Sequence, residues 1–255
     1  RDSCNEAQGH MKRLPNNIHR WLALAAGFVL ITTTYLSAED WPQWRGINRD
    51  AIWIDSGVVA EFPDEGLTVK WSAPVRGGFA GPAVAERRVF VLDYQETPGS
   101  RTMDGHERLV VFDEETGALL WQREWPATYR NLQIKFATGP RAVPTVDGPR
   151  VYTLGAAGML SCFDTETGDL VWRVDTVTDY DSTVPVQGTS QARIVEGDLL
   201  IAAVGGEPDA KDVAFDKVTG DEVWRSLDNI SETGYSAPIV IHAGGVRQLI
   251  LWHAT

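Results

Sequence analysis

The stretch "AFDKVTGDEVW" (residues 214–224) repeats a phrase that occurs twice earlier, as "VFDEETGALLW" (111–121) and "CFDTETGDLVW" (162–172). The copies share the pattern F-D-x-x-T-G-x-x-x-W, and their final tryptophans are 51 and 52 residues apart. Counting back 50 residues from the first of these tryptophans leads to Trp71 in "GLTVKWSAPV" (66–75), which we interpret as a partial first copy. A period near 50 residues is typical of a propeller blade of four strands.

The chemistry of the phrase predicts a tight turn between two strands. Its Asp can accept a backbone N–H group, its Thr can close the turn, and its Gly permits positive φ. The Trp stands at a fixed offset in the return strand, where it can pack against the turn of the neighbouring unit. We therefore assign a structural role, and not catalysis, to the repeated residues Asp113, Thr116, Gly117, Trp121, Asp164, Thr167, Gly168, Trp172, Asp216, Thr219, Gly220 and Trp224.

A second phrase precedes each copy and predicts a strand, a tight turn and a strand. It occurs as "GPAVAERRVFVL" (81–92), "VPTVDGPRVYTL" (143–154), "ARIVEGDLLIAAV" (192–204) and "APIVIHAGGVRQLIL" (237–251). Pro82, Pro144 and Pro238 hold one slot of this phrase, and Arg193 holds it in the third copy. Proline suits the first residue of a strand, because no ladder donor is needed there. Each unit is thus two hairpins that form one antiparallel sheet.

These patterns predict an all-β fold for residues 39–255, a β-propeller of four-stranded antiparallel blades. The repeats end near residues 75, 126, 177 and 229, and a partial blade runs to 255. Trp71 and Trp252 lie in strand-like runs, and no segment after residue 38 has a helical period. About four blades fit into this length, so we expect an incomplete ring.

Residues 1–38 are predicted to be a secretory signal with upstream residues. Lys12, Arg13 and Arg20 precede the apolar run 21–36, and cleavage is expected after Ala38. Met11 stands where an initiator is expected. The alternative, an uncleaved anchor, suits the run less well because a spanning helix needs about 20 apolar residues. We therefore expect an exported protein that is periplasmic or located elsewhere at the cell envelope or outside the cell, and that meets the membrane only during export.

Charge and cysteine usage narrow the range of partners. The formal net charge is −12, which disfavours nucleic acid as a partner. Cys4 precedes the signal, so Cys162 is alone in the predicted mature chain and cannot form a disulfide within it. We expect Cys162 to be a packed thiol, because small residues occupy its place in the other copies.

The sequence offers little support for a catalytic or metal site. His106, His242 and His253 lack the spacing of metal ligands. The acidic segment "DTVTDYDST" (175–183) lacks the pattern of a calcium loop, so we expect a solvated loop between blades. The segment "GGEPDAKD" (205–212) lacks the Lys-Ser/Thr of a phosphate loop.

One set of residues is a candidate binding site on geometrical grounds. In a propeller, the connections that enter the innermost strands converge at one mouth of the central channel. The residues three places before the slot are Phe79, Arg141, Ser190 and Tyr235. An aromatic pair beside an Arg can hold a flat anionic ligand, and the alternative is that these residues only plug the channel.

The phrase "AFDKVTGDEVW" resembles the tryptophan-docking repeat of the pyrroloquinoline-quinone-like (PQQ-like) β-propellers, and "DWPQWRGINRD" (40–50) resembles the start of exported bacterial members labelled polyvinyl-alcohol dehydrogenase-like. This resemblance covers 40–255 and includes quinoprotein alcohol dehydrogenases and BamB-type assembly lipoproteins. It implies a ring of seven or eight blades, of which this chain would be the N-terminal part. Enzymes of the family bind PQQ with calcium and use a catalytic Asp, a Trp beneath the ring and a disulfide between adjacent cysteines. None of these elements can be assigned to residues here.

Three functions therefore remain open. The first is a non-catalytic binding scaffold at the cell envelope, which holds a protein or small-molecule ligand at the propeller face and needs no cofactor. The second is a PQQ- and calcium-dependent dehydrogenase that oxidises alcohols or sugars. The third is a BamB-like factor in outer-membrane assembly, which the absence of a Cys after the apolar run disfavours.

Overall fold

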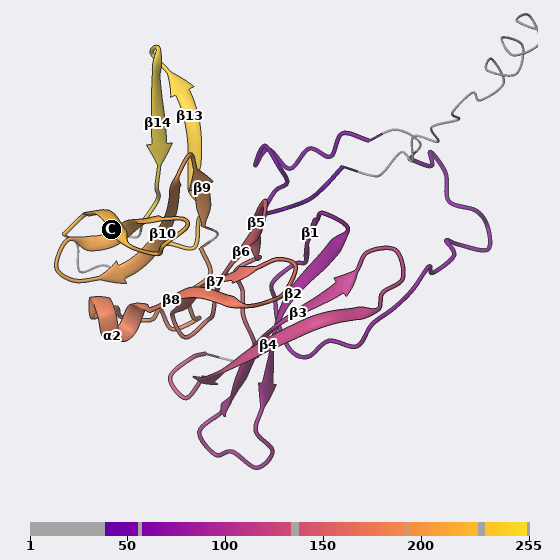
Figure 1. The fold of residues 1–255 in the computed structure, drawn as a ribbon, viewed down its shortest axis with the longest axis horizontal. Helices are drawn as coiled ribbons and strands as arrows, with labels where there is room; N and C mark the ends of the chain where they lie inside the picture. The colour runs from indigo at the N-terminus through magenta and orange to yellow at the C-terminus, as the bar shows by residue number, and fades with distance from the viewer. Residues whose placement is uncertain (1–38, 56–57, 134–137, 192, 229–232, 254–255) are drawn as a thin grey trace, which may run out of the picture. The chain divides into compact units, whose positions relative to one another are not determined.

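The computed structural model describes the part of the chain that was predicted to be the propeller (Figure 1), namely residues 39–55, 58–133, 138–191, 193–228 and 233–253. The predicted signal peptide, with Met11 and the cleavage after Ala38, lies outside the described residues, as does Cys4. Within the described ranges, no helix has the length and apolar character needed to cross a bilayer.

Three four-stranded antiparallel sheets and one hairpin follow each other along the chain, and we call them blades 1 to 4. Blade 1 contains β1 (Ala83–Ala85), β2 (Arg88–Glu96), β3 (Asp104–Asp113) and β4 (Leu119–Thr128). Blade 2 contains β5 (Thr145–Asp147), β6 (Arg150–Leu154), β7 (Met159–Asp164) and β8 (Leu170–Asp175). Blade 3 contains β9 (Ile194–Glu196), β10 (Leu199–Gly206), β11 (Ala210–Asp216) and β12 (Glu222–Ser226). The hairpin of blade 4 is β13 (Ile239–Ala243) with β14 (Val246–Ile250).

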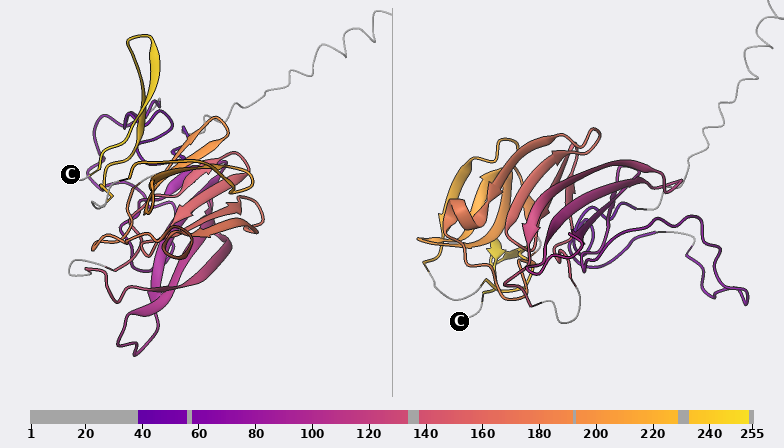
Figure 2. Two further views of the ribbon diagram at one scale, coloured as in Figure 1. Left: turned by 90° about the vertical axis from the view of Figure 1, so that its left-hand side faces the viewer. Right: turned by 90° about the horizontal axis from the view of Figure 1, so that it is seen from below.

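Strand order within each sheet follows the chain, which confirms the prediction of two hairpins per unit for blades 1, 2 and 3. Each slot residue directly precedes the first strand of its blade, as expected for a proline that needs no ladder donor. In Figure 2 the sheets of blades 1, 2 and 3 lie next to one another in chain order. Apolar side chains of neighbouring sheets pack together between them.

Three expectations from the sequence were wrong. The segment 175–183 is not a loop throughout, because a short helix, α2 (Thr176–Tyr180), lies within it. The Asp175 side chain caps this helix by accepting from the N–H groups of Val177 and Thr178, and Tyr180 is buried. Trp71 and Trp252 lie outside the strands of the structure. A single turn of helix is too short to leave a periodic signal, and an isolated segment such as that of Trp71 has no sheet to join among the described residues.

The repeated phrase forms the same turn in blades 1, 2 and 3. In blade 2 the Asp164 carboxylate accepts from the backbone N–H of Thr167 at 2.9 Å. Gly168 has a φ of +72°, and the indole of Trp121 from blade 1 lies directly over it. A Cβ atom at Gly168 would lie 2.7 Å from that indole, so only glycine fits both the turn and the close approach. The seam between two blades is therefore built from the Trp of one repeat and the Gly of the next.

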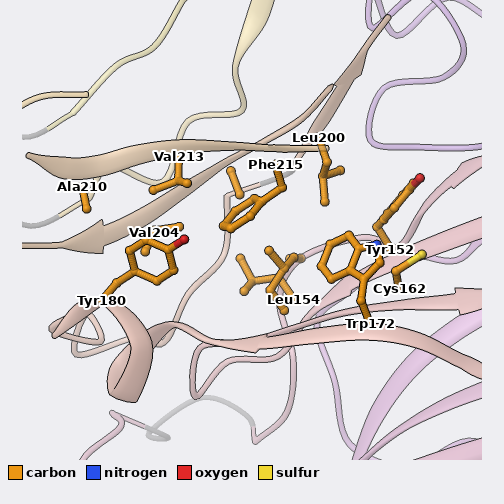
Figure 3. Packing of buried hydrophobic residues seen from close by; sticks show 13 residues of the cluster. Tyr152, Leu154, Cys162, Trp172, Tyr180, Leu200, Val204, Ala210, Val213 and Phe215 are labelled. Atoms are coloured by element: carbon orange, nitrogen blue, oxygen red, sulfur yellow. The ribbon is translucent and has the colours of Figure 1, made fainter. Parts of the chain in front are cut away.

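A large apolar cluster fills the seam between blades 2 and 3 (Figure 3). Trp172 and Leu154 point from blade 2 toward Phe215 and Leu200 of blade 3, and the Trp172 and Phe215 ring centroids are 6.2 Å apart. Cys162 is buried beside Trp172, its partner in register across β7 and β8, as expected, and burial raises the pKa of its thiol to about 12. Burying side chains of this size stabilises a fold by about 1.5–3 kcal/mol each.

The first strands of the blades converge, since β5 contacts β1 on one side and β9 on the other. The segment 41–49, which we call the axial strap, runs across these strands. Trp41 exchanges two backbone hydrogen bonds with Val84 of β1, and the carbonyl oxygen of Pro42 accepts from Val146 of β5. The far end of the strap is held by Arg49.

Arg49 anchors the strap to blades 3 and 4 through the slot positions. Its guanidinium donates to the carbonyl oxygen of Arg193 and, at 2.9 Å, to that of Pro238. Its Nε also donates to the Gln43 side chain at 3.0 Å. The strap therefore bonds to the innermost part of each of the four blades in chain order.

Candidate functional site

The residues that enter the innermost strands come together beside the strap, as the alignment of the slot predicts. A pocket of about 170 Å³, which we call the mouth pocket, is lined by Trp44, Arg141, Val143, Ser190, Tyr235 and Ala237. Three of the four predicted residues thus share one pocket. The fourth, Phe79, contacts the pocket through Arg141, whose Cζ lies 4.4 Å from the Phe79 ring centroid.

Backbone hydrogen bonds between blades 1 and 2 fix this cation–π pair. The N–H groups of Phe79 and Ala80 both donate to the carbonyl oxygen of Pro140, at 2.8 and 3.0 Å. Arg141 is the next residue, so its side chain begins beside the Phe79 ring. A guanidinium over an aromatic face is stabilised by about 0.5–2 kcal/mol and retains its charge.

The mouth pocket offers a cation, a hydroxyl and aromatic surfaces. Among the described residues, Arg141 forms no ion pair, and the buried Ser190 Oγ has no hydrogen-bond partner. Trp44 and Tyr235 are about half exposed and border the pocket. Such a combination suits one anionic group attached to a flat or apolar body. Sequence reasoning missed Trp44, although the cluster of tryptophans in 41–53 was a usable signal.

A cofactor of the PQQ and calcium type does not fit this pocket. The lining residues carry no carboxylate that could serve as a calcium ligand. Within the described ranges, no group of three or more His, Cys, Asp or Glu side chains is arranged to hold a metal ion. Pockets that enclose drug-sized ligands have volumes of roughly 300–1,000 Å³, so 170 Å³ suits a smaller group than a tricyclic cofactor.

A buried carboxylate between blades 1 and 2 was not predicted. Glu107 of β3 is fully buried and accepts from Trp125 Nε1 at 2.9 Å, Tyr129 OH at 2.7 Å and Ala156 N at 2.6 Å. Burial raises the pKa of Glu107, and these donors oppose the shift. Because its oxygens are taken up by donors, we assign Glu107 to the joint between the two blades. Its place on the inward face of β3, beside Leu109, was the signal that could have revealed it.

A second buried acid pairs with one of the scattered histidines. His253 Nε2 lies 2.7 Å from Asp212 Oδ2, and both side chains are largely buried. Burial raises the pKa of Asp212, and the adjacent His253 opposes this shift. The pair attaches the segment after β14 to β11 of blade 3.

Repeated four-stranded sheets with equivalent seams and converging first strands define the fold as that of a β-propeller. A family model described as outer membrane protein assembly factor BamB matches residues 105–250, more than half of the 255-residue chain. The chain belongs to this family of PQQ-like repeat proteins. No curated protein matches the chain.

Three solved structures are similar to part of the chain. The quinohemoprotein alcohol dehydrogenase from Comamonas testosteroni is similar with a TM-score of 0.54 and 21% identity, over 75% of this chain and 28% of that one. A europium-containing methanol dehydrogenase has a TM-score of 0.41 and 17% identity, over 62% of this chain and 26% of that one. BamB from Moraxella catarrhalis has a TM-score of 0.34 and 21% identity, over 64% of this chain and 41% of that one. The chain thus spans less than half the length of each. The likeness to the Comamonas testosteroni enzyme concerns the fold alone.

Proposed function

We propose that this chain is part of an exported, non-catalytic β-propeller that acts as a binding scaffold at the cell envelope. In this proposal the mouth pocket holds one anionic group of a partner protein or small molecule. The observation that carries it is the position of Arg141 over Phe79 at the rim of a pocket of about 170 Å³. The family's description and the predicted signal in residues 1–38 support a location at the envelope.

The size and the charge of the pocket support a scaffold over a dehydrogenase. A pocket of this volume accepts a single side chain or a small acid, and its donors recognise an anionic oxygen. The alternative, a quinone-dependent dehydrogenase, requires ligands for the cofactor and its metal ion that the lining residues do not supply.

Benzoate, a flat monoanion, is a suitable probe, and saturation-transfer NMR detects weak binding. We expect a benzoate signal that Arg141→Gln reduces by about tenfold, because a charge-assisted hydrogen bond is lost. Arg101→Gln removes one exposed positive charge elsewhere and should leave the signal unchanged. Benzamide, the neutral analogue, should bind less than benzoate. Benzoate binding that Arg141→Gln does not alter would overturn the assignment of the pocket.

A second experiment separates the scaffold from the enzyme. The protein is mixed with PQQ and calcium, desalted, and examined for quinone absorbance and for reduction of an artificial dye with alcohols and sugars. The proposal predicts no retained quinone and no dye reduction. Stoichiometric quinone with substrate-dependent dye reduction would establish the dehydrogenase instead.

A further inference from the structure

A second, larger pocket is lined, in blades 3 and 4, by residues that follow the slot positions in the sequence. It has a volume of about 450 Å³, and its lining includes Gln43, Arg45, Asn48 and Arg49 of the strap with Glu196 and Arg247 of blades 3 and 4. We call it the strap pocket. The mouth pocket is lined by residues that precede the slots, whereas blades 3 and 4 line the strap pocket with residues that follow them. The two pockets are therefore distinct sites.

The strap pocket is positively charged although the chain is acidic. Three arginines and one glutamate line it, while the formal net charge of the chain is −12. Glu196 forms an ion pair with Arg247. In the part of the chain that the structure describes, Arg45 and Arg49 form no ion pair, so two guanidinium groups at this pocket lack an anionic partner.

The unpaired charge extends into the protein behind the pocket. Arg49 is only 9% exposed and donates to neutral acceptors alone. Arg193, whose carbonyl oxygen Arg49 contacts, is 0% exposed and donates to the carbonyl oxygens of Val143 and Tyr152 at 2.7 and 3.1 Å. A buried charge without a counter-charge costs several kcal/mol, so an anion close to these groups is favoured.

Both buried guanidinium groups remain charged at neutral pH. Burial lowers the pKa of Arg49 to about 10, and burial together with the charge of Arg49 lowers the pKa of Arg193 to about 9. Since both values lie above 7, the positive potential is present under ordinary conditions. Arg45 is exposed, and among the residues that the structure describes the one hydrogen bond of its side chain is a long contact of 3.4 Å from Nη2 to the carbonyl oxygen of Asp50. It is free to turn toward a ligand.

We infer that the strap pocket binds a small polyvalent oxyanion, a molecule with two or more anionic oxygens such as a phosphate compound or a polycarboxylate. The guanidinium fork of Arg45 matches such oxygens in geometry and charge, and the Asn48 amide adds a donor. Arg49, which also lines the pocket, supplies positive charge, while its own hydrogen bonds hold the strap. A volume of about 450 Å³ lies within the range of small-molecule sites. This inference does not depend on the function proposed for the mouth pocket.

Pyrophosphate and citrate are the probes, measured by thermal unfolding and isothermal titration calorimetry, with sodium chloride at matched ionic strength as the reference. We expect at least one of the two to raise the unfolding temperature above the reference, because it binds only the folded chain. Arg45→Gln should weaken that binding by about tenfold, the loss expected for one charge-assisted contact. Pyrophosphate binding alone indicates a phosphate ligand, and citrate binding alone indicates a polycarboxylate.

The matched control is Arg101→Gln, which removes the same charge at an exposed site away from both pockets. It should bind the probe like the unmodified chain. Arg45 is exposed, so Arg45→Gln should fold normally, which circular dichroism checks, and it should still bind benzoate. Equal probe binding by Arg45→Gln and the unmodified chain, or no effect of either probe beyond sodium chloride, overturns the inference.

Discussion

The indole Nε1 of Trp121 donates a hydrogen bond of 3.1 Å to the carbonyl oxygen of Thr165, which directly follows the repeated Asp of the next blade. Trp172 makes the same bond to Lys217 at 3.2 Å, and Trp71 makes it to Glu114 at 2.8 Å. The acceptor is in each case the residue after the repeated Asp. Neighbouring blades are therefore joined by an identical side-chain bond, while backbone ladders stay within each sheet.

Replacing Trp172 by Ala should destabilise the seam between blades 2 and 3. Trp172 is 8% exposed and packs on Phe215, so its removal costs both a hydrogen bond and a large apolar contact. We expect the free energy of unfolding to fall by about 3–5 kcal/mol, as for other buried tryptophans. Urea unfolding measures this. Trp252 is 74% exposed, and Trp252→Ala should change the value by less than about 0.5 kcal/mol. Equal losses of unfolding free energy in the two variants would contradict the role of Trp172 in the seam.

Gly148 and Gly168 have similar backbone conformations, so replacing each by Ala separates the cost of backbone strain from the cost of a steric contact. Gly148 has a φ of +50° and no atom within 4 Å of a Cβ position, so Gly148→Ala should cost about 1 kcal/mol of backbone strain. Gly168 has a φ of +72° and would place Cβ 2.7 Å from the Trp121 indole. Gly168→Ala should therefore cost at least twice as much and alter the near-ultraviolet circular dichroism. If the two variants lose equal stability and leave that spectrum unchanged, the indole does not rest on the turn.

The repeat made the blades predictable because each copy carries its own turn chemistry. The pattern F-D-x-x-T-G-x-x-x-W contains the turn, the glycine and the Trp, so the contact of Trp121 with Gly168 follows from adding one period. The slot allowed Phe79 and Arg141 to be placed together in the same way. Trp71 fits the period, and its indole covers the turn of blade 1 at Gly117, yet it lies in no strand. The period therefore predicts the contact of the Trp with the next turn, but it does not predict that the Trp belongs to a sheet.

The strap and Glu107 were not predictable from the repeat. Arg49 contacts Arg193 and Pro238, which are 144 and 189 residues away, and no second copy of the strap exists to reveal the pattern. Arg193 departs from the proline of the slot, and this departure was a visible signal of a special role. Glu107 lies outside the pattern that the copies share, so its position among apolar neighbours is the feature of the sequence that sets it apart from an ordinary surface glutamate.

The pKa of Glu107 predicts a dependence of stability on pH. Because burial raises this pKa in the folded chain above its value in the unfolded chain, the folded chain holds a proton that the unfolded chain has lost. Stability from Glu107 is complete below the unfolded pKa of about 4.3 and declines as pH rises toward the folded value, by at most about 1.4 kcal/mol per pH unit. Glu107→Gln should lack this decline.

The measurement is urea unfolding of the unmodified chain and of Glu107→Gln between pH 4.5 and 7, with the difference plotted against pH so that shared groups cancel. Glu124 is exposed on β4 of the same blade, and Glu124→Gln serves as the matched control. A difference that stays constant with pH, or one in which the unmodified chain gains stability as pH rises, means that the donors from Trp125, Tyr129 and Ala156 outweigh burial.

Replacing Arg49 by Met should loosen blades 3 and 4 while leaving blade 1 intact. The change removes the donors to the carbonyl oxygens of Arg193 and Pro238, and a buried acceptor without a donor costs about 1–3 kcal/mol. It also removes a buried charge, which offsets part of this cost. The free energy of global unfolding should therefore fall by less than the free energy of local opening at blades 3 and 4. Hydrogen exchange should therefore accelerate in 194–206 and 239–250 and stay unchanged in 83–96. Arg45→Met changes the same strap at a residue that contacts neither slot, so it should leave all three segments protected. If hydrogen exchange accelerates equally in all three segments of Arg49→Met, the strap does not hold individual blades.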